Sequence, residues 1–105
     1  MKKIECVIQN KMLGALEAEL RLHGVGGMTV SEVKGFGNEQ TRPEAYLFLP
    51  KTKIEIYCKD SEVDGLVGII TKVCQTGQLG DGKLVVIDLE QVMRLRTGQT
   101  GADAV

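Results

Sequence analysis

The order in which hydrophobic periodicities follow one another constrains this chain more than any other feature of its sequence. Apolar and polar residues alternate where a half-buried strand is expected, and apolar residues recur every three to four positions in an amphipathic helix. On this basis we predict strands at residues 2–9, 28–33, 51–59 and 84–89, and helices at residues 11–23 and 63–74. The order β-α-β-β-α-β predicts a ferredoxin-like α+β fold, an antiparallel sheet with two helices on one face.

The other face of this sheet is expected to meet either solvent or a partner. Val7, Val30 and Val33 place apolar side chains on mixed faces of the predicted strands, which favours an oligomer. The length of 105 residues fits one domain, and a domain of this size gains from association because it buries little surface alone. Asp60 or Ser61 is expected to cap the second helix.

Charge and hydropathy exclude several classes of protein. Lys and Arg number 13 against 14 Asp and Glu, so the net charge of −1 gives no overall positive field for binding nucleic acid. No apolar run approaches the roughly 18 residues that a membrane-spanning helix needs. Met1-Lys2-Lys3 leads directly into an alternating segment, which is not the pattern of a signal peptide. We therefore expect a soluble, cytoplasmic protein.

The cysteines and the histidine do not form a recognisable metal or catalytic set. Cys6, Cys58 and Cys74 are odd in number and lack a CxxC motif, which argues against a disulfide framework and against zinc. All three lie on predicted apolar faces, so we interpret them as reduced core residues, with a reactive role as the alternative. His23 ends a predicted helix and is interpreted as a capping or surface residue. No nucleophile–base arrangement or close carboxylate pair is recognisable, so neither an enzyme nor a metal site is expected.

A glycine-rich segment at residues 76–83 is the strongest candidate for a binding site. It contains the GxxxxGK pattern of a phosphate-binding loop, but it follows a helix, precedes a strand and ends in Leu84 instead of Ser or Thr. The nucleoside-triphosphatase interpretation therefore fails. Phosphate binding by successive backbone N–H groups and Lys83 remains open, and an ordinary glycine-rich turn is an equal alternative on these residues alone. Arg94 and Arg96 would project to one side of an extended chain, and this pair favours a polyphosphate ligand.

Five segments of the sequence resemble the PII signal transduction family in their order and spacing. They are MKKIE at the start, GMTVSEVKGFG at 27–37, LPKTKIEI at 49–56, TGQLGDGK at 76–83 and RLRTG at 94–98. The resemblance covers nearly the whole chain. It implies a single PII-like domain over residues 1–105, with a short effector loop at 38–48, a phosphate loop at 76–83 and a flexible C-terminal segment at 94–105. It also implies a homotrimer that binds an adenine nucleotide in each cleft between neighbouring subunits.

The resemblance also assigns individual residues to that site. Gly80, Asp81, Gly82 and Lys83 would line the phosphates, together with Arg94 and Arg96 from the adjacent subunit. The adenosine side would be formed by Thr29, Gly35, Gly37 and Glu55, with Val7 and Ile8 near the base. Lys51 matches the family lysine at the base of the long loop, where small effectors are sensed.

Several departures from the family pattern bear on the effector. Asn38-Glu39 stands where the family has an Arg-Gln pair, and Glu39 would repel an anion such as 2-oxoglutarate. The loop has only eleven residues, and Tyr46 lies near its returning end, so uridylylation is not carried over. Gln9 and Asn10 replace a basic residue and a proline that the family has after the first strand.

The altered effector region resembles that of carboxysome-associated PII-like proteins. This resemblance leads us to expect a regulatory sensor that binds ADP, AMP or ATP, together with a small anionic effector such as bicarbonate. It would signal through loop order to an unidentified target protein, either a membrane transporter or a carboxysome-related protein. Two alternatives stay open. One is a nitrogen-regulatory PII protein that binds ATP and 2-oxoglutarate to control a transporter or an enzyme, and the other is a small enzyme that hydrolyses the nucleotide.

Overall fold

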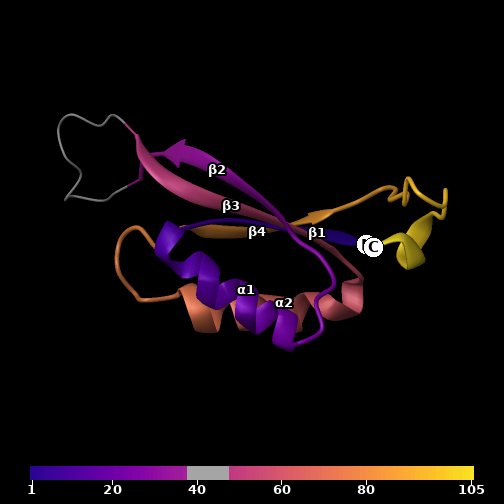
Figure 1. Cartoon of the computed structure of the whole chain (residues 1–105), viewed down its shortest axis with the longest axis horizontal. Coiled ribbons are helices and arrows are strands. Elements are labelled where there is room, and N and C mark those ends of the chain that lie inside the picture. Colours follow the sequence, from indigo (N-terminus) through magenta and orange to yellow (C-terminus); the bar gives the residue numbers. More distant parts are fainter. Residues whose placement is uncertain (38–47) are drawn as a thin grey trace.

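The computed structural model describes residues 1–37 and 48–105, in which two helices cover one face of a four-stranded antiparallel sheet (Figure 1). The strands are β1 (Lys2–Ile8), β2 (Thr29–Gly35), β3 (Leu49–Cys58) and β4 (Lys83–Asp88), and the helices are α1 (Leu13–Leu22) and α2 (Val63–Cys74). Short 3₁₀ turns occupy Asn10–Met12, Asp60–Glu62 and Gly101–Ala104. The strand order is β2-β3-β1-β4. The predicted ferredoxin-like α+β fold is therefore confirmed.

The third strand begins two residues earlier than predicted, at Leu49, and includes Pro50. A proline cannot donate a backbone hydrogen bond, so it is usually excluded from central strands. Here β1 ends at Ile8, which pairs with Thr52, and only β2 continues alongside Pro50. Because one side of β3 has no neighbour at that point, the proline is tolerated.

The core lies between the helices and the sheet. Ile4, Leu16 and Ile54 are completely buried. The three cysteines are buried and unpaired, as expected for reduced core residues. Burial raises the pKa of the Cys6 thiol to about 11. A thiol with so high a pKa is largely protonated at neutral pH and therefore a poor nucleophile.

The sheet face opposite the helices carries four charges at its centre. Glu5 of β1 pairs with Glu55 of β3, and Lys3 and Lys53 flank this pair. The Nζ atom of Lys3 lies 3.3 Å from a Glu5 oxygen and 3.2 Å from a Glu55 oxygen. The Nζ atom of Lys53 lies 3.4 Å and 3.9 Å from the same two carboxylates. Each of the two adjacent carboxylates thus has two ammonium groups nearby, which offset the repulsion between them. We call these four residues the charge quartet.

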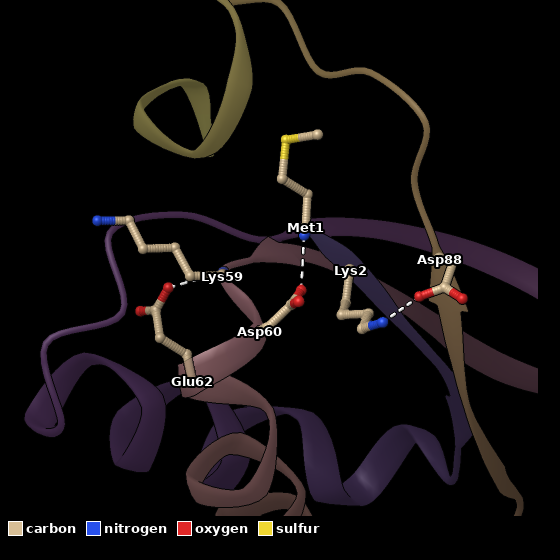
Figure 2. Close-up of polar contacts among 6 residues, drawn as sticks. All are labelled: Met1, Lys2, Lys59, Asp60, Glu62 and Asp88. Carbon is tan, nitrogen blue, oxygen red and sulfur yellow. Dashed lines mark hydrogen bonds and ion pairs between the residues drawn. The ribbon is translucent and has the colours of Figure 1, made fainter.

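Ion pairs hold the start of β1 to the segment that precedes α2 and to the end of β4 (Figure 2). The Met1 amino group lies 2.6 Å from the Asp60 carboxylate, and Lys2 pairs with Asp88. The Lys59 N–H donates to the Glu62 carboxylate at 2.9 Å. The expectation that Asp60 or Ser61 caps α2 is wrong, because neither side chain makes a capping hydrogen bond and the Asp60 carboxylate faces the amino group instead.

Candidate functional site

The glycine-rich segment forms a turn between α2 and β4 that only glycines can adopt without strain. Gly77, Gly80 and Gly82 have φ angles of +83°, +98° and +97°. This is the left-handed region, where residues with a Cβ are disfavoured. The composition of this segment is therefore dictated by its backbone shape, whatever it binds.

Gly82 is also pressed against the end of β1. A Cβ atom built on this residue would lie 1.7 Å from the carbonyl oxygen of Val7. Lys83 follows immediately and pairs with Val7 across the sheet. Lys51, from the start of β3, also reaches the turn, with its Nζ 3.4 Å from the carbonyl oxygen of Gly80. The turn is thus fixed against two central strands.

Asp81 folds back onto the beginning of this turn. One carboxylate oxygen accepts hydrogen bonds from the N–H groups of Thr76, at 2.7 Å, and Gly77, at 2.9 Å. The other oxygen accepts the hydroxyl of Thr76 and lies 3.5 Å from the Nε2 atom of Gln9. These hydrogen bonds, above all that of the Thr76 hydroxyl, lower the pKa of the Asp81 carboxyl. We call residues 76–83, with these contacts, the glycine turn.

Several other residues that the family resemblance assigns to the nucleotide site lie near the glycine turn. Gly35 pairs with Leu49 at the same end of the sheet, and Gly37 follows it. The Ile8 side chain is only 2% exposed and belongs to the core, so the main chain is the part of Ile8 that faces the turn. Glu39 and Tyr46, with residues 38–47 of the predicted effector loop, lie outside the described residues.

A second group of predicted residues lines a separate cavity of about 500 Å³. Thr29, Glu55 and Arg94 contribute to its wall. The rest of the wall comes from residues 24–28, Ile56, Tyr57 and Glu62, and from the C-terminal Ala104 and Val105. Glu55 belongs both to this wall and to the charge quartet, so Lys3 constrains its carboxylate from the open face of the sheet. We call this the arginine cavity.

The segment after β4 is folded back on itself. Met93 forms a β-bridge with Thr100, and the Arg94 N–H donates to the Gln99 carbonyl at 2.8 Å. Residues 95–97 form a turn, in which the Thr97 N–H bonds to the Arg94 carbonyl at 3.2 Å. The expectation that Arg94 and Arg96 project together from an extended chain is therefore wrong, since Arg96 itself lies in this turn. Both arginines are exposed, but only Arg94 lines the cavity.

The glycine turn and the arginine cavity lie at opposite ends of the molecule. Figure 1 shows the turn before β4 at one end of the sheet and the C-terminal segment beyond the other end. β4 has six residues, which span about 20 Å at roughly 3.3 Å each, and Arg94 follows six residues after the end of β4. One chain therefore does not bring the predicted nucleotide-binding residues together.

Other sequence candidates have structural roles in the described part of the chain. The Nδ1 atom of His23 lies 2.8 Å from the carbonyl oxygen of Glu19 at the end of α1, which fits the predicted capping role. Among residues 1–37 and 48–105 no cluster of three or more His, Cys, Asp or Glu side chains could hold a metal ion. No helix in these ranges has the length and apolar character needed to cross a membrane.

Sequence reasoning did not single out some contacts that shape the site. Thr76 and Gln9 were not recognised as partners of Asp81, nor Tyr57 as a wall of the arginine cavity. A threonine five residues before an aspartate, with glycines between them, is a signal that could have pointed to the first contact. The quartet of charges could not be foreseen without the register of β1 against β3.

Comparisons with known proteins agree on one family. The family model for "Nitrogen regulatory protein P-II" matches residues 1–99. Proteins named "Nitrogen regulatory protein P-II" from Mesorhizobium japonicum, Pasteurella multocida and Microchaete diplosiphon are 45%, 43% and 41% identical to the chain, each over the whole length of both proteins. These alignments span 112 positions against 105 residues, so seven positions (112 − 105) have no counterpart in this chain.

Proposed function

The chain belongs to the nitrogen regulatory protein P-II family, whose members are signalling proteins, and we propose that it senses an adenine nucleotide, ADP, AMP or ATP. The observation that supports this ligand is the glycine turn. Three glycines with positive φ angles precede Lys83, and they are held between β1 and β3. Backbone N–H groups in such a turn, together with an ammonium group, suit the oxygens of a phosphate chain.

We further propose that each nucleotide site is shared between two copies of the chain in a homotrimer. The glycine turn of one copy would receive the phosphates, while the arginine cavity of a neighbour would supply Arg94 and hold the adenosine beside Thr29 and Glu55. The cavity volume of about 500 Å³ lies within the usual range for small-ligand sites. A closed cyclic assembly would satisfy every such half-site equally.

A small anion is the second ligand that we propose. Lys51 stands at the entrance of the segment that would sense it, next to the glycine turn. Bicarbonate is favoured over 2-oxoglutarate, because Glu39 replaces the family glutamine and a carboxylate repels a dianion more strongly than a monoanion. The signal would pass to a target protein through the order of the loop. Binding would be used for signalling and not for catalysis, so no phosphate release above background is expected.

Titration calorimetry tests the ligands directly. ADP, AMP and ATP are titrated with and without bicarbonate, and magnesium-ATP with and without 2-oxoglutarate. We expect heat with at least one nucleotide, a change on adding bicarbonate, and none on adding 2-oxoglutarate. A response to 2-oxoglutarate instead would establish the nitrogen-sensing alternative, and no heat with any nucleotide would refute the sensor.

The phosphate role of Lys83 is tested by Lys83→Ala. This change should weaken nucleotide binding by about 1.5–3 kcal/mol, the range for hydrogen bonds to charged groups. Lys72→Ala is the matched control, because Lys72 is an exposed lysine on α2, in the helical layer. Equal affinities for the two variants would contradict the assignment.

Mixing subunits tests the shared site. Lys83→Ala removes one half of the site and Arg94→Ala the other, so each variant alone should bind nucleotide weakly. When the two variants are unfolded together and refolded, mixed assemblies regain sites that combine an intact turn with an intact cavity. Failure of the mixture to bind better than either variant would show that the site is not divided between chains.

A further inference from the structure

Asp81 lies inside the proposed phosphate site, yet its carboxylate is directed at the protein itself. Both oxygens are engaged by the start of the turn, through the N–H groups of Thr76 and Gly77 and the hydroxyl of Thr76. The Nε2 atom of Gln9, at the end of β1, approaches the same carboxylate at 3.5 Å. A carboxylate with its oxygens engaged in this way has little capacity left for a ligand.

The hydrogen bonds of the turn are divided between its two halves. Asp81 accepts those of residues 76 and 77, whereas residues 79 and 80 form a hydrogen-bonded turn of their own, outside the reach of this carboxylate's hydrogen bonds. Successive backbone amides in a glycine-rich turn that no carboxylate engages attract anions. The carboxylate therefore organises the first half of the turn and leaves the second half available.

The negative charge of Asp81 would otherwise oppose phosphate binding. A carboxylate next to a polyphosphate repels it, and the repulsion weakens when hydrogen-bond donors surround the carboxylate. Thr76 supplies two of these donors, from its backbone and its side chain. The contacts that fix the glycine turn therefore also direct the carboxylate of Asp81 away from the amides of residues 79–82.

From these contacts we propose that Asp81 and Thr76 are positioning residues, which hold the glycine turn in its anion-receiving shape without touching the ligand. Gln9 connects this pair to the end of β1. The effect on affinity rests on the proposed nucleotide function, but the effect on the turn does not. Preorganising a loop in its binding shape raises affinity because less conformational freedom is lost on binding.

The test compares four variants of the full chain. Asp81→Asn removes the charge and replaces one accepting oxygen by an NH2 group, so the side chain can no longer accept both from the N–H groups of Thr76 and Gly77 and from the Thr76 hydroxyl. Thr76→Val deletes the hydroxyl at nearly constant shape, and Thr76→Ser retains it. Asp64→Asn makes the same chemical change at an exposed carboxylate on α2. For each protein, hydrogen exchange of the amides at residues 76–78 is measured without nucleotide, and the ADP affinity is measured by calorimetry.

We expect Asp81→Asn to accelerate exchange in the turn and to weaken ADP binding roughly tenfold, with a smaller effect of Thr76→Val. Thr76→Ser should restore most of the protection, and Asp64→Asn should behave like the unchanged protein. The amides of the strands and helices, which exchange more slowly than those of the turn, must remain slow in every variant. This control separates loosening of the turn from general unfolding.

Two results would overturn the positioning role. One is unchanged exchange in the turn of both Asp81→Asn and Thr76→Val. The other is weaker ADP binding by Asp81→Asn while exchange stays unchanged, which would mean that Asp81 contacts the ligand. If the unchanged protein binds no nucleotide, the proposed function fails, and the exchange data alone still decide whether Asp81 and Thr76 hold the turn.

Discussion

Gly82 is the position where the structure makes its sharpest prediction about stability. Replacing Gly82 by alanine places a methyl group 1.7 Å from the carbonyl oxygen of Val7, where ordinary contact begins at about 3.4 Å. The turn and the end of β1 must therefore separate by about 1.7 Å (3.4 − 1.7). The colliding atom belongs to the backbone of a central strand, so it cannot rotate aside as a side chain would.

Two contributions determine how much free energy of unfolding Gly82→Ala should cost. A residue with a Cβ in the left-handed region costs about 1–2 kcal/mol. Forcing apart a well-packed contact costs about 1–3 kcal/mol more. The expected loss in free energy of unfolding is about 2–5 kcal/mol, and the displaced turn should also bind nucleotide more weakly.

Gly77→Ala provides the matched control. Gly77 has a similar φ angle, +83°, but apart from its two chain neighbours no atom of residues 1–37 and 48–105 lies within 4 Å of the position that a Cβ would take there. Only the first contribution applies, so about 1–2 kcal/mol should be lost. Urea unfolding followed by circular dichroism, at one fixed protein concentration, gives both values. Equal losses for the two alanine variants would refute the argument that the Val7 carbonyl makes Gly82 obligatory.

Three further predictions concern the core, the thiols and the acid sensitivity of the fold. Leu16→Ala, at a completely buried site, should lower the free energy of unfolding by about 2–5 kcal/mol, whereas Leu22→Ala, at a 78% exposed site, should change it by less than about 0.5 kcal/mol. Comparable urea midpoints for the two would contradict this account of the core. Because the pKa of the buried Cys6 thiol is raised to about 11, an aromatic disulfide reagent at about pH 8 should label it only after unfolding, and rapid labelling of the native protein would count against its burial. The Met1 amino group lowers the pKa of Asp60, and Lys3 lowers that of Glu5, so the folded state favours both ionised forms. Their contribution is complete above the ordinary carboxyl pKa of about 4 and is lost as the pH falls through the lowered values, so urea midpoints should decrease from about pH 6 to about pH 3. Constant midpoints over that range would argue against these pairs.

The order of the elements was predictable because the sequence alternates cleanly in the strands and repeats at helical spacing in α2. Both patterns are local, and burial against a shared core enforces them. The start of β3 was not predictable in this way. Its inclusion of Pro50 depends on where β1 ends, which is a property of strand pairing and not of the residues near the proline.

In the candidate site, too, features set by neighbouring residues were predictable from the sequence, and features set by contacts along the folded chain were not. The glycines and Lys83 of the turn were visible in the sequence, since positive φ angles demand glycine and a phosphate favours a cation. The orientation of Asp81 was not visible, because it depends on how the turn folds back onto Thr76. Arg96 was misplaced because an extended chain was assumed where the Thr97 N–H closes a turn on the Arg94 carbonyl.

The distance between the glycine turn and the arginine cavity has a consequence for the proposed shared site, because the response to nucleotide would then depend on how much of the chain is present. If a nucleotide must touch two copies, it binds the assembly and not the separated chain, and so it drives association by mass action. Dilution would then lower the apparent affinity, although no residue had changed. A cell could adjust the threshold of such a sensor through the rate at which it makes the protein.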